Sequence, residues 1–255
     1  MKSNAIARIV LNAILILLLV AILISALGIE LFSISSGNYQ SANEGSVDAA
    51  TVKELSIDWA AGTVTILTDD TDKITFSETG DFNSKYDMVY SIEDGKLSIE
   101  YAKDSVTVGF GAIPEKDLTI AVPSSWRCEE LELDAAAVEV SIEGLSVGNL
   151  ELDCAAGEVC FNGSVDTIDC DGAAMELSIT CVNKPSTINI DGAACELTIK
   201  LPAGCGYDAQ ITSLGGEFNS NVAFTKNDSS YKYGDESCKL FIDGLGSEVN
   251  IQIAE

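Results

Sequence analysis

The chain has 255 residues, of which 40 are acidic, 14 are basic and none is histidine, so its formal net charge at pH 7 is −26. This charge repels nucleic acids and anionic lipids, and neither is expected to bind the bulk of the protein directly. The absence of histidine excludes histidine-based catalytic triads and metal sites with histidine ligands.

The chain begins with a strongly apolar segment. Residues 9–27 (IVLNAILILLLVAILISAL) contain only two polar residues, and a helix of this length extends about 28 Å, close to the thickness of a bilayer's hydrocarbon core. Lys2 and Arg8 precede it, and Glu30 is the first charge after it, so the positive-inside rule places the N-terminus in the cytoplasm. We expect a cytoplasmic tail at residues 1–8 and a single-pass signal-anchor helix at 9–29.

A cleaved signal peptide, with Ala26-Leu27-Gly28 as the cleavage site, is the alternative for this segment. The apolar core of a signal peptide is usually shorter, about 7–15 residues, which favours a retained anchor. Residues 30–50 include the polar run SISSGNYQSANEGS, which predicts a flexible linker. An extracytoplasmic domain at 51–255 follows, and the lipid bilayer is an expected partner through residues 9–29.

A short phrase recurs along the outer domain, as LELDCAAGEV (150–159), IDCDGAAMEL (168–177) and INIDGAACEL (188–197). Alignment on its aspartate defines a turn column, which contains Asp58, Asp134, Asp153, Asp171, Asp191, Asp243 and, in one copy, Thr212. Five residues further on lies an acidic column, which contains Glu139, Glu158, Glu176, Glu196, Glu217, Glu248 and, in one copy, Thr63. The regular spacing indicates a repeat architecture.

Apolar residues alternate with polar ones on both sides of each aspartate, which is typical of strands with one buried face. The spacing of about 18–20 residues is too short for a strand–helix–strand unit. We therefore predict an all-β fold, a single-chain β-solenoid similar to a parallel β-helix, with coils of about 18–22 residues stacked one on the next. An antiparallel sandwich or meander is the alternative.

Three segments fit the phrase less well. KLSIEY (96–101) and DLTIAVP (117–123) resemble the second arm of a coil and are expected to form degenerate coils near the N-terminal end. The polar stretch TKNDSSYKYGDESC (225–238) is expected to be a loop before the last copy.

Each aspartate of the turn column is expected to cap its own turn by accepting a hydrogen bond from a backbone amide. Weak, millimolar Ca²⁺ binding at Asp134, Asp153, Asp171 and Asp191 is the alternative, because hard cations prefer oxygen ligands. No calcium-binding motif supports it, and no other cofactor is expected. The acidic column is expected to face solvent, where it favours solubility.

The eight cysteines form no CxxC pair, which argues against a zinc or thioredoxin-type centre. Cys170 and Cys195 are expected in the core, and Cys160 on the surface. The remaining cysteines, Cys128, Cys154, Cys181, Cys205 and Cys238, either pair in part as disulfides or stay reduced.

Catalysis is not expected. Between residues 128 and 225 only Lys184 and Lys200 are basic, and no long loops are present to wall a cleft, as they do in β-helical polysaccharide lyases. The aspartates follow the repeat, whereas catalytic groups converge in one pocket.

The segment LELDCAAGEVCF…IDCDGAAMELSI…INIDGAACELTIKLPAG, behind a single membrane segment, resembles the bacterial putative-adhesin family, a β-strand-repeat domain of unknown function found on surface and membrane proteins. The resemblance covers roughly residues 51–255. It implies an extracytoplasmic β-solenoid that acts in adhesion or envelope-stress sensing and brings no catalytic residues. Val138, Met175 and Cys195 stand where the family commonly has glycine, which puts the turn geometry in question.

These features predict a membrane-anchored, non-catalytic surface protein that contacts an envelope protein or a glycan. An envelope stress sensor or regulator is the second hypothesis, and a polysaccharide-active β-helix enzyme is the remote third.

Overall fold

The computed structural model describes residues 39–80, 84–102, 113–193, 195–214, 216–245 and 248–255. Apart from two short 3-10 turns, η1 (Ala49–Thr51) and η2 (Ser84–Tyr86), the regular structure of these residues is β-strand, so the all-β prediction is confirmed. Within the same residues there is no helix long and apolar enough to span a bilayer. The predicted tail and anchor at 1–29 lie outside the described residues.

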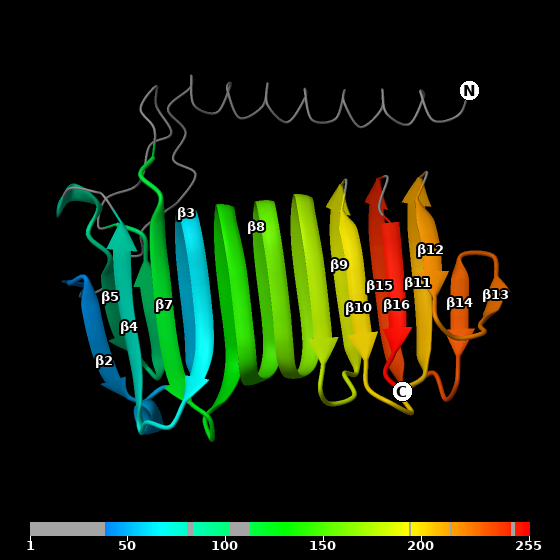
Figure 1. Cartoon of the computed structure of the whole chain (residues 1–255), viewed down its shortest axis with the longest axis horizontal. Helices are drawn as coiled ribbons and strands as arrows, with labels where there is room; N and C mark the ends of the chain where they lie inside the picture. The colour runs from blue at the N-terminus through cyan, green and yellow to red at the C-terminus, as the bar shows by residue number, and fades with distance from the viewer. Residues whose placement is uncertain (1–38, 81–83, 103–112, 194, 215, 246–247) are drawn as a thin grey trace.

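The strands are β1 (Gln40–Ser41), β2 (Glu44–Asp48), β3 (Glu54–Asp69), β4 (Lys73–Gly80), β5 (Val89–Glu93), β6 (Lys96–Glu100), β7 (Lys116–Pro123), β8 (Arg127–Cys181), β9 (Thr187–Ala193), β10 (Glu196–Leu201), β11 (Tyr207–Leu214), β12 (Glu217–Ser220), β13 (Thr225–Asn227), β14 (Ser230–Tyr233), β15 (Cys238–Leu245) and β16 (Glu248–Ile253). Figure 1 shows them side by side along the long axis of the molecule, with β8 winding through successive coils.

Each coil consists of two arms joined by a bend, and equivalent arms pair in parallel and in register. In the first arms Leu55 lies opposite Leu131, and in the second arms Val64 lies opposite Val140. The alternating apolar side chains of both arms are buried in one continuous core. The predicted parallel stacking of like positions is therefore present, and the antiparallel alternative does not describe these coils.

The stacking order differs from the chain order at both ends. The coil formed by β6 and β7 lies outside β3, although it follows β3 in the sequence. At the other end β15 pairs with both β9 and β11, and β16 pairs with both β10 and β12. The expectation that each coil stacks on the one before it is wrong there. Arms that share one period-two pattern can pair with each other in register, so the pattern does not specify which are neighbours.

Three segments depart from the sequence prediction. Residues 96–100 form a first arm, since β6 pairs with Glu54–Asp58, and not a second arm. The expected loop at 225–238 contains the hairpin β13–β14, which adds to β11. Residues 40–50 of the predicted linker form β1, β2 and the start of η1, so the linker prediction is wrong for that part.

Antiparallel strands extend both layers at the N-terminal end of the stack and one layer at the C-terminal end. At the N-terminal end β5 and β1 extend the first layer beyond β6, and β4 and β2 extend the second layer beyond β7. At the C-terminal end the β13–β14 hairpin extends the first layer. Such strands cover open edges of a parallel sheet that would otherwise pair with another chain.

In each bend a larger residue lies beside a smaller one. A Cβ on Gly62 or Gly157 would lie 2.0 Å from a backbone oxygen of the neighbouring coil, and both have positive φ. Where Met175 or Cys195 replaces such a glycine, the residue after the aspartate is glycine instead, and its Cβ would clash with that side chain. The resulting pairs are Trp59 with Gly62, Cys154 with Gly157, Gly172 with Met175, Gly192 with Cys195, and Ala135 with Val138. The departures from family glycines are therefore accommodated by compensation within the bend.

Candidate functional site

The turn column forms a continuous row on the outer face of the first-arm layer. Asp58 lies opposite Asp134, Asp191 lies opposite Asp171 and Asp243, and Thr212 follows Asp243. The charge of Asp153 acts on both Asp134 and Asp171, which places it between them. Glu100 opposes Asp58 and extends the row at the N-terminal end. The stack thus gathers carboxylates that are 18 or more residues apart in the sequence.

The predicted capping by these aspartates does not occur. Within the part of the chain that the structure describes, no hydrogen bond joins a turn-column carboxylate to a backbone amide. The reason is that the strand continues past each of the aspartates into the bend, which leaves no turn for the side chain to close.

The burial of the aspartates in this row decreases from its N-terminal to its C-terminal end. Asp58 and Asp134 are half-buried, whereas Asp153, Asp171, Asp191 and Asp243 are exposed. Burial, together with the charges of Asp134 and Glu100, raises the pKa of Asp58 to about 7. Burial and the charge of Asp153 raise the pKa of Asp134 as well. Asp58, in the N-terminal part of the row, therefore takes up a proton near neutral pH.

A hollow of about 350 Å³ lies over this N-terminal part and is lined by Tyr39, Asp58, Glu100 and Asp134 among others. The Tyr39 hydroxyl donates a hydrogen bond to Glu100 Oε1, while Glu100 Oε2 is buried and has no hydrogen-bond partner among the described residues. Burial raises the pKa of Glu100, although the Tyr39 hydroxyl partly offsets it. A buried oxygen without a partner favours the protonated acid.

The acidic column runs along the second-arm layer. Glu196 lies opposite both Glu176 and Glu248, and Glu217 follows Glu248. Glu139 lies opposite Thr63. The six glutamates Glu139, Glu158, Glu176, Glu196, Glu217 and Glu248 are all exposed. Solvent screens their mutual repulsion, which is about 0.9 kcal/mol for two charges 4.8 Å apart in water.

A buried ion pair that sequence reasoning missed closes the N-terminal end. The side chains of Lys116 and Glu78 are fully buried, with Nζ 2.5 Å from Oε2. Lys116 also donates to the carbonyl oxygens of Tyr86 and Tyr101, and its ammonium lies 4.6 Å from the Trp59 ring centroid. Burial lowers the pKa of Lys116, and Glu78 opposes that change. Its one sequence signal is a lysine at an inward position of the strand KDLTIAVP (116–123).

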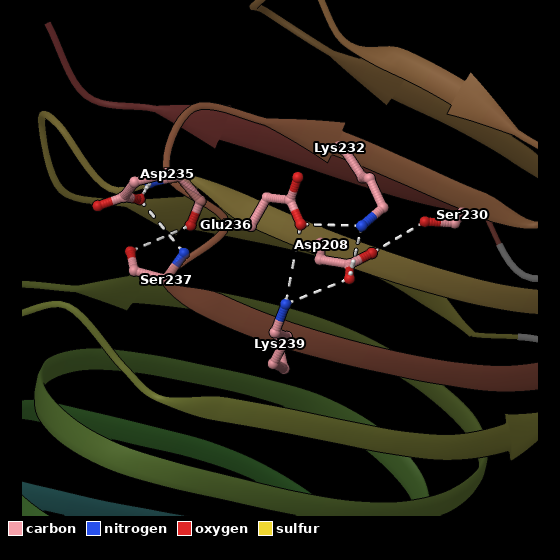
Figure 2. Close-up of polar contacts among 8 residues, drawn as sticks. Asp208, Ser230, Lys232, Asp235, Glu236, Ser237 and Lys239 are labelled. Carbon is pink, nitrogen blue, oxygen red and sulfur yellow. Dashed lines mark hydrogen bonds and ion pairs between the residues drawn. The ribbon is translucent and has the colours of Figure 1, made fainter.

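A second cluster, partly open to water, closes the C-terminal end (Figure 2). Asp208 is 7% exposed and accepts hydrogen bonds from Ser230 at 2.9 Å, Lys232 at 3.1 Å and Lys239 at 3.2 Å. Lys232 also donates to Glu236 at 2.8 Å. Burial acts to raise the pKa of Asp208, but these three donors hold it below its usual value. The cluster ties β11, β14 and β15 together.

All eight cysteines are free thiols, and every one except the partly exposed Cys160 is buried. Cys170 lies opposite Ile190 in the core, and Cys195 fills the bend at Gly192, as expected. Burial raises the pKa values of Cys128, Cys154 and Cys181 to about 12. These thiols stay protonated and act as small apolar side chains.

No group of three or more histidine, cysteine, aspartate or glutamate residues, among those that the structure describes, is arranged to hold a metal ion. The calcium candidates Asp134, Asp153, Asp171 and Asp191 lie in a single row, so their carboxylates do not converge from several sides on one point. Ca²⁺ takes six to eight oxygen ligands.

A family model described as Toastrack DUF4097 matches residues 52–183. The chain resembles the crystal structure of a putative cell adhesion protein from Clostridium sporogenes ATCC 15579, with 14% identity, a TM-score of 0.50 and coverage of 84% of this chain and 100% of that one. It also resembles that of a putative adhesin from Bacteroides fragilis NCTC 9343, with 10% identity, a TM-score of 0.41 and coverage of 86% and 98%. No curated protein shows significant similarity to this chain.

Proposed function

Because the chain belongs to the Toastrack DUF4097 family, we propose that it is a membrane-anchored surface protein whose non-catalytic outer domain mediates adhesion or other contacts within the cell envelope. The observation that carries this proposal is the pair of continuous side-chain columns on the two layers of the stack. A stack of this kind presents one pattern of side chains over a long surface, which suits binding of an extended partner.

The anchor and the location belong to the same proposal. The apolar run at 9–27 and the basic residues before it support a helix at 9–29 that holds the domain outside the cytoplasmic membrane. In this arrangement the bilayer is one partner, and the other is an envelope protein or a glycan. The Clostridium sporogenes protein of similar fold is described as a putative cell adhesion protein, which supports the same role here.

A non-catalytic role agrees with how the acids are distributed. The carboxylates repeat from coil to coil at equivalent positions, whereas an active site brings unlike groups together at one place. The proposal accordingly assigns no substrate and no cofactor.

Envelope sensing is the second candidate, and the half-buried acids of the N-terminal part favour it. Asp58 has a pKa of about 7, so an acid shift within the physiological range changes its charge. A domain with such a group responds to the pH outside the membrane.

The test uses the full chain on intact cells. Externally added protease should digest the domain without lysis if it lies outside the membrane. Cells displaying the protein should attach to other cells or to matrix-coated surfaces more strongly than cells that carry the Val159→Asp variant, which removes the fold but keeps the anchor. Equal attachment argues against adhesion. A changed envelope-stress response with unchanged attachment supports the sensor.

A further inference from the structure

One large apolar side chain projects from the outer face of the first-arm layer near its C-terminal end. Phe241, in β15, is 43% exposed, although β15 lies in the interior of the layer between β9 and β11. No aromatic ring of the described residues stacks on it. A single exposed ring is ordinary on a protein surface, so the groups around it decide whether it belongs to a binding surface.

The neighbours of Phe241 are groups that bind hydroxyls. Its partners across the sheet are Asn189 on β9 and Gln210 on β11, each about 4.8 Å away along the row. Asp169 lies beyond Asn189 in the same row. Two residues further along the strands, Asp243 pairs with Thr212. The ring is thus surrounded by amides that both donate and accept, by carboxylates that accept, and by a hydroxyl that does both.

These residues line a hollow, which we name the Phe241 trough. It has a volume of about 310 Å³ and is lined by Asp169, Asn189, Gln210, Thr212, Phe241 and Asp243 among others. Through Thr212 and Asp243 it continues into a hollow of about 880 Å³ over the bends, which Ser229 of the β13–β14 turn borders. The trough crosses the four neighbouring strands β8, β9, β15 and β11, a span of about 14 Å at the spacing of neighbouring strands.

We propose that the Phe241 trough binds an oligosaccharide that is neutral or carries amino groups. The ring supplies a flat apolar face for stacking, and the surrounding amides, carboxylates and Thr212 supply hydrogen bonds to hydroxyl groups. This proposal names the partner class for the adhesion role and rests on that proposed function.

The charge of the trough selects among saccharides. Neither hollow is lined by lysine or arginine in the described part of the chain. The nearby Lys239 is engaged with Asp208 and Glu236. Carboxylates without cations repel uronic acids, sulfated sugars and phosphates. They accept hydrogen bonds from hydroxyl groups and attract amino groups.

The position of the trough disfavours a peptide. Peptides that bind sheets commonly add a strand to an open edge through main-chain hydrogen bonds. The floor of the trough is mid-sheet, where β9 and β15 are paired on both sides. Recognition there depends on side chains, and side chains of mixed donors and acceptors around a ring suit a polyhydroxylated ligand.

The test is a binding titration with the purified full-length protein. The probes are chito-oligosaccharides, their deacetylated forms, cello-oligosaccharides, oligogalacturonates and hexalysine. At least one neutral or amino-bearing oligosaccharide should bind, and Phe241→Ala should weaken binding roughly tenfold, which corresponds to about 1.4 kcal/mol. Asn189→Ala should weaken it less, and Phe241→Tyr should retain it. Ile92→Ala is the matched control, because Ile92 is 44% exposed at the other end and should not change affinity.

Three results overturn the proposal. They are binding of no neutral or amino-bearing oligosaccharide, tighter binding of oligogalacturonate, or a Phe241-dependent affinity for hexalysine alone that falls steeply with salt. Cell attachment distinguishes a failure of the adhesion proposal from a failure of the trough proposal. If Phe241→Ala cells still attach while Val159→Asp cells do not, adhesion stands and the trough is not its site. If wild-type cells do not attach but the purified protein binds the sugar through Phe241, adhesion fails and the trough stands.

Discussion

The two ends of the stack solve one problem in different ways. Each must close an apolar core where the coils stop, and each uses lysine and carboxylate side chains. At the N-terminal end the Lys116–Glu78 pair is fully buried. At the C-terminal end the Asp208 cluster leaves the side chains of Lys232 and Lys239 36% and 44% exposed. Removing one partner from a fully buried ion pair is costly, because the remaining charge has no solvent. Removing one from a partly exposed cluster costs less, because water can replace the lost partner.

The largest loss of stability is expected from a change in the core between the two ends. Val159 is fully buried in an apolar column, so Val159→Asp places an unpaired charge in the core and should destabilise the domain by more than about 4 kcal/mol. Circular dichroism and urea titration should show the loss of the cooperative transition. A melting temperature within a few degrees of wild type contradicts the assigned register.

The second-largest loss of stability should come from breaking the Lys116–Glu78 pair at the N-terminal end. Lys116→Ala leaves Glu78 buried without its cation and should reduce the free energy of unfolding by about 3–5 kcal/mol. The double variant Lys116→Met, Glu78→Leu should recover much of that loss, because it removes both charges. Urea denaturation measures both variants. A double variant no more stable than Lys116→Ala means that the pair itself, and not the orphaned charge, provides the stability.

Disrupting the Asp208 cluster at the C-terminal end should cost less stability. Asp208→Ala removes three hydrogen-bond partners, but the two lysines can turn to water, so a loss of about 1–3 kcal/mol is expected from charge-assisted hydrogen bonds. Denaturation at 0.05 M and 1 M NaCl should show that the difference from wild type shrinks with salt. A loss equal to that of Lys116→Ala removes the contrast between the ends.

The ends should also differ in their response to pH. The pKa of Asp58 is raised from 3.8 to about 7 in the folded state, so between pH 4 and 7 the folded protein binds more protons than the unfolded chain, and stability falls as pH rises. Asp58→Asn should remove this slope and stabilise the domain above pH 7, with little effect at pH 4. The rise from 3.8 to about 7 corresponds to at most about 4 kcal/mol, and solvent around the half-buried side chain reduces this value. Asp243→Asn, in the exposed part of the row, is the matched control. Parallel stability curves for wild type and Asp58→Asn rule out the raised pKa.

The smallest effect should come from the exposed acidic column. Glu158 adjoins Val159 in sequence but points to solvent, so Glu158→Lys should change stability by less than about 0.5 kcal/mol. Thermal melting beside Val159→Asp compares the two faces of one strand. A large loss would mean that the column of glutamates is itself structural.

Much of the candidate site could be predicted from the sequence because each coil repeats the same alternation of apolar and polar residues. The alternation around Asp153, Asp171 and Asp191 places like residues at like positions, and parallel pairing then forces them into rows. The Lys116–Glu78 pair and the Phe241 trough were not accessible in this way. Their members come from strands that are neighbours only in space, and their sequence signals are a lysine or a phenylalanine at an unexpected position of an ordinary strand.

By itself the sequence determined the strands of the repeated coils, the side of each of these strands that faces the core, and the rows that equivalent aspartates and glutamates form, because these follow from a local period that the coils share. Only the tertiary structure decided the order of the coils at the two ends, the closure of those ends and the surroundings of Phe241. The physical reason is that arms with the same alternation pair equally well in register. The order is therefore set by contacts between distant segments, such as Lys116 with Glu78 and Asp208 with Lys239.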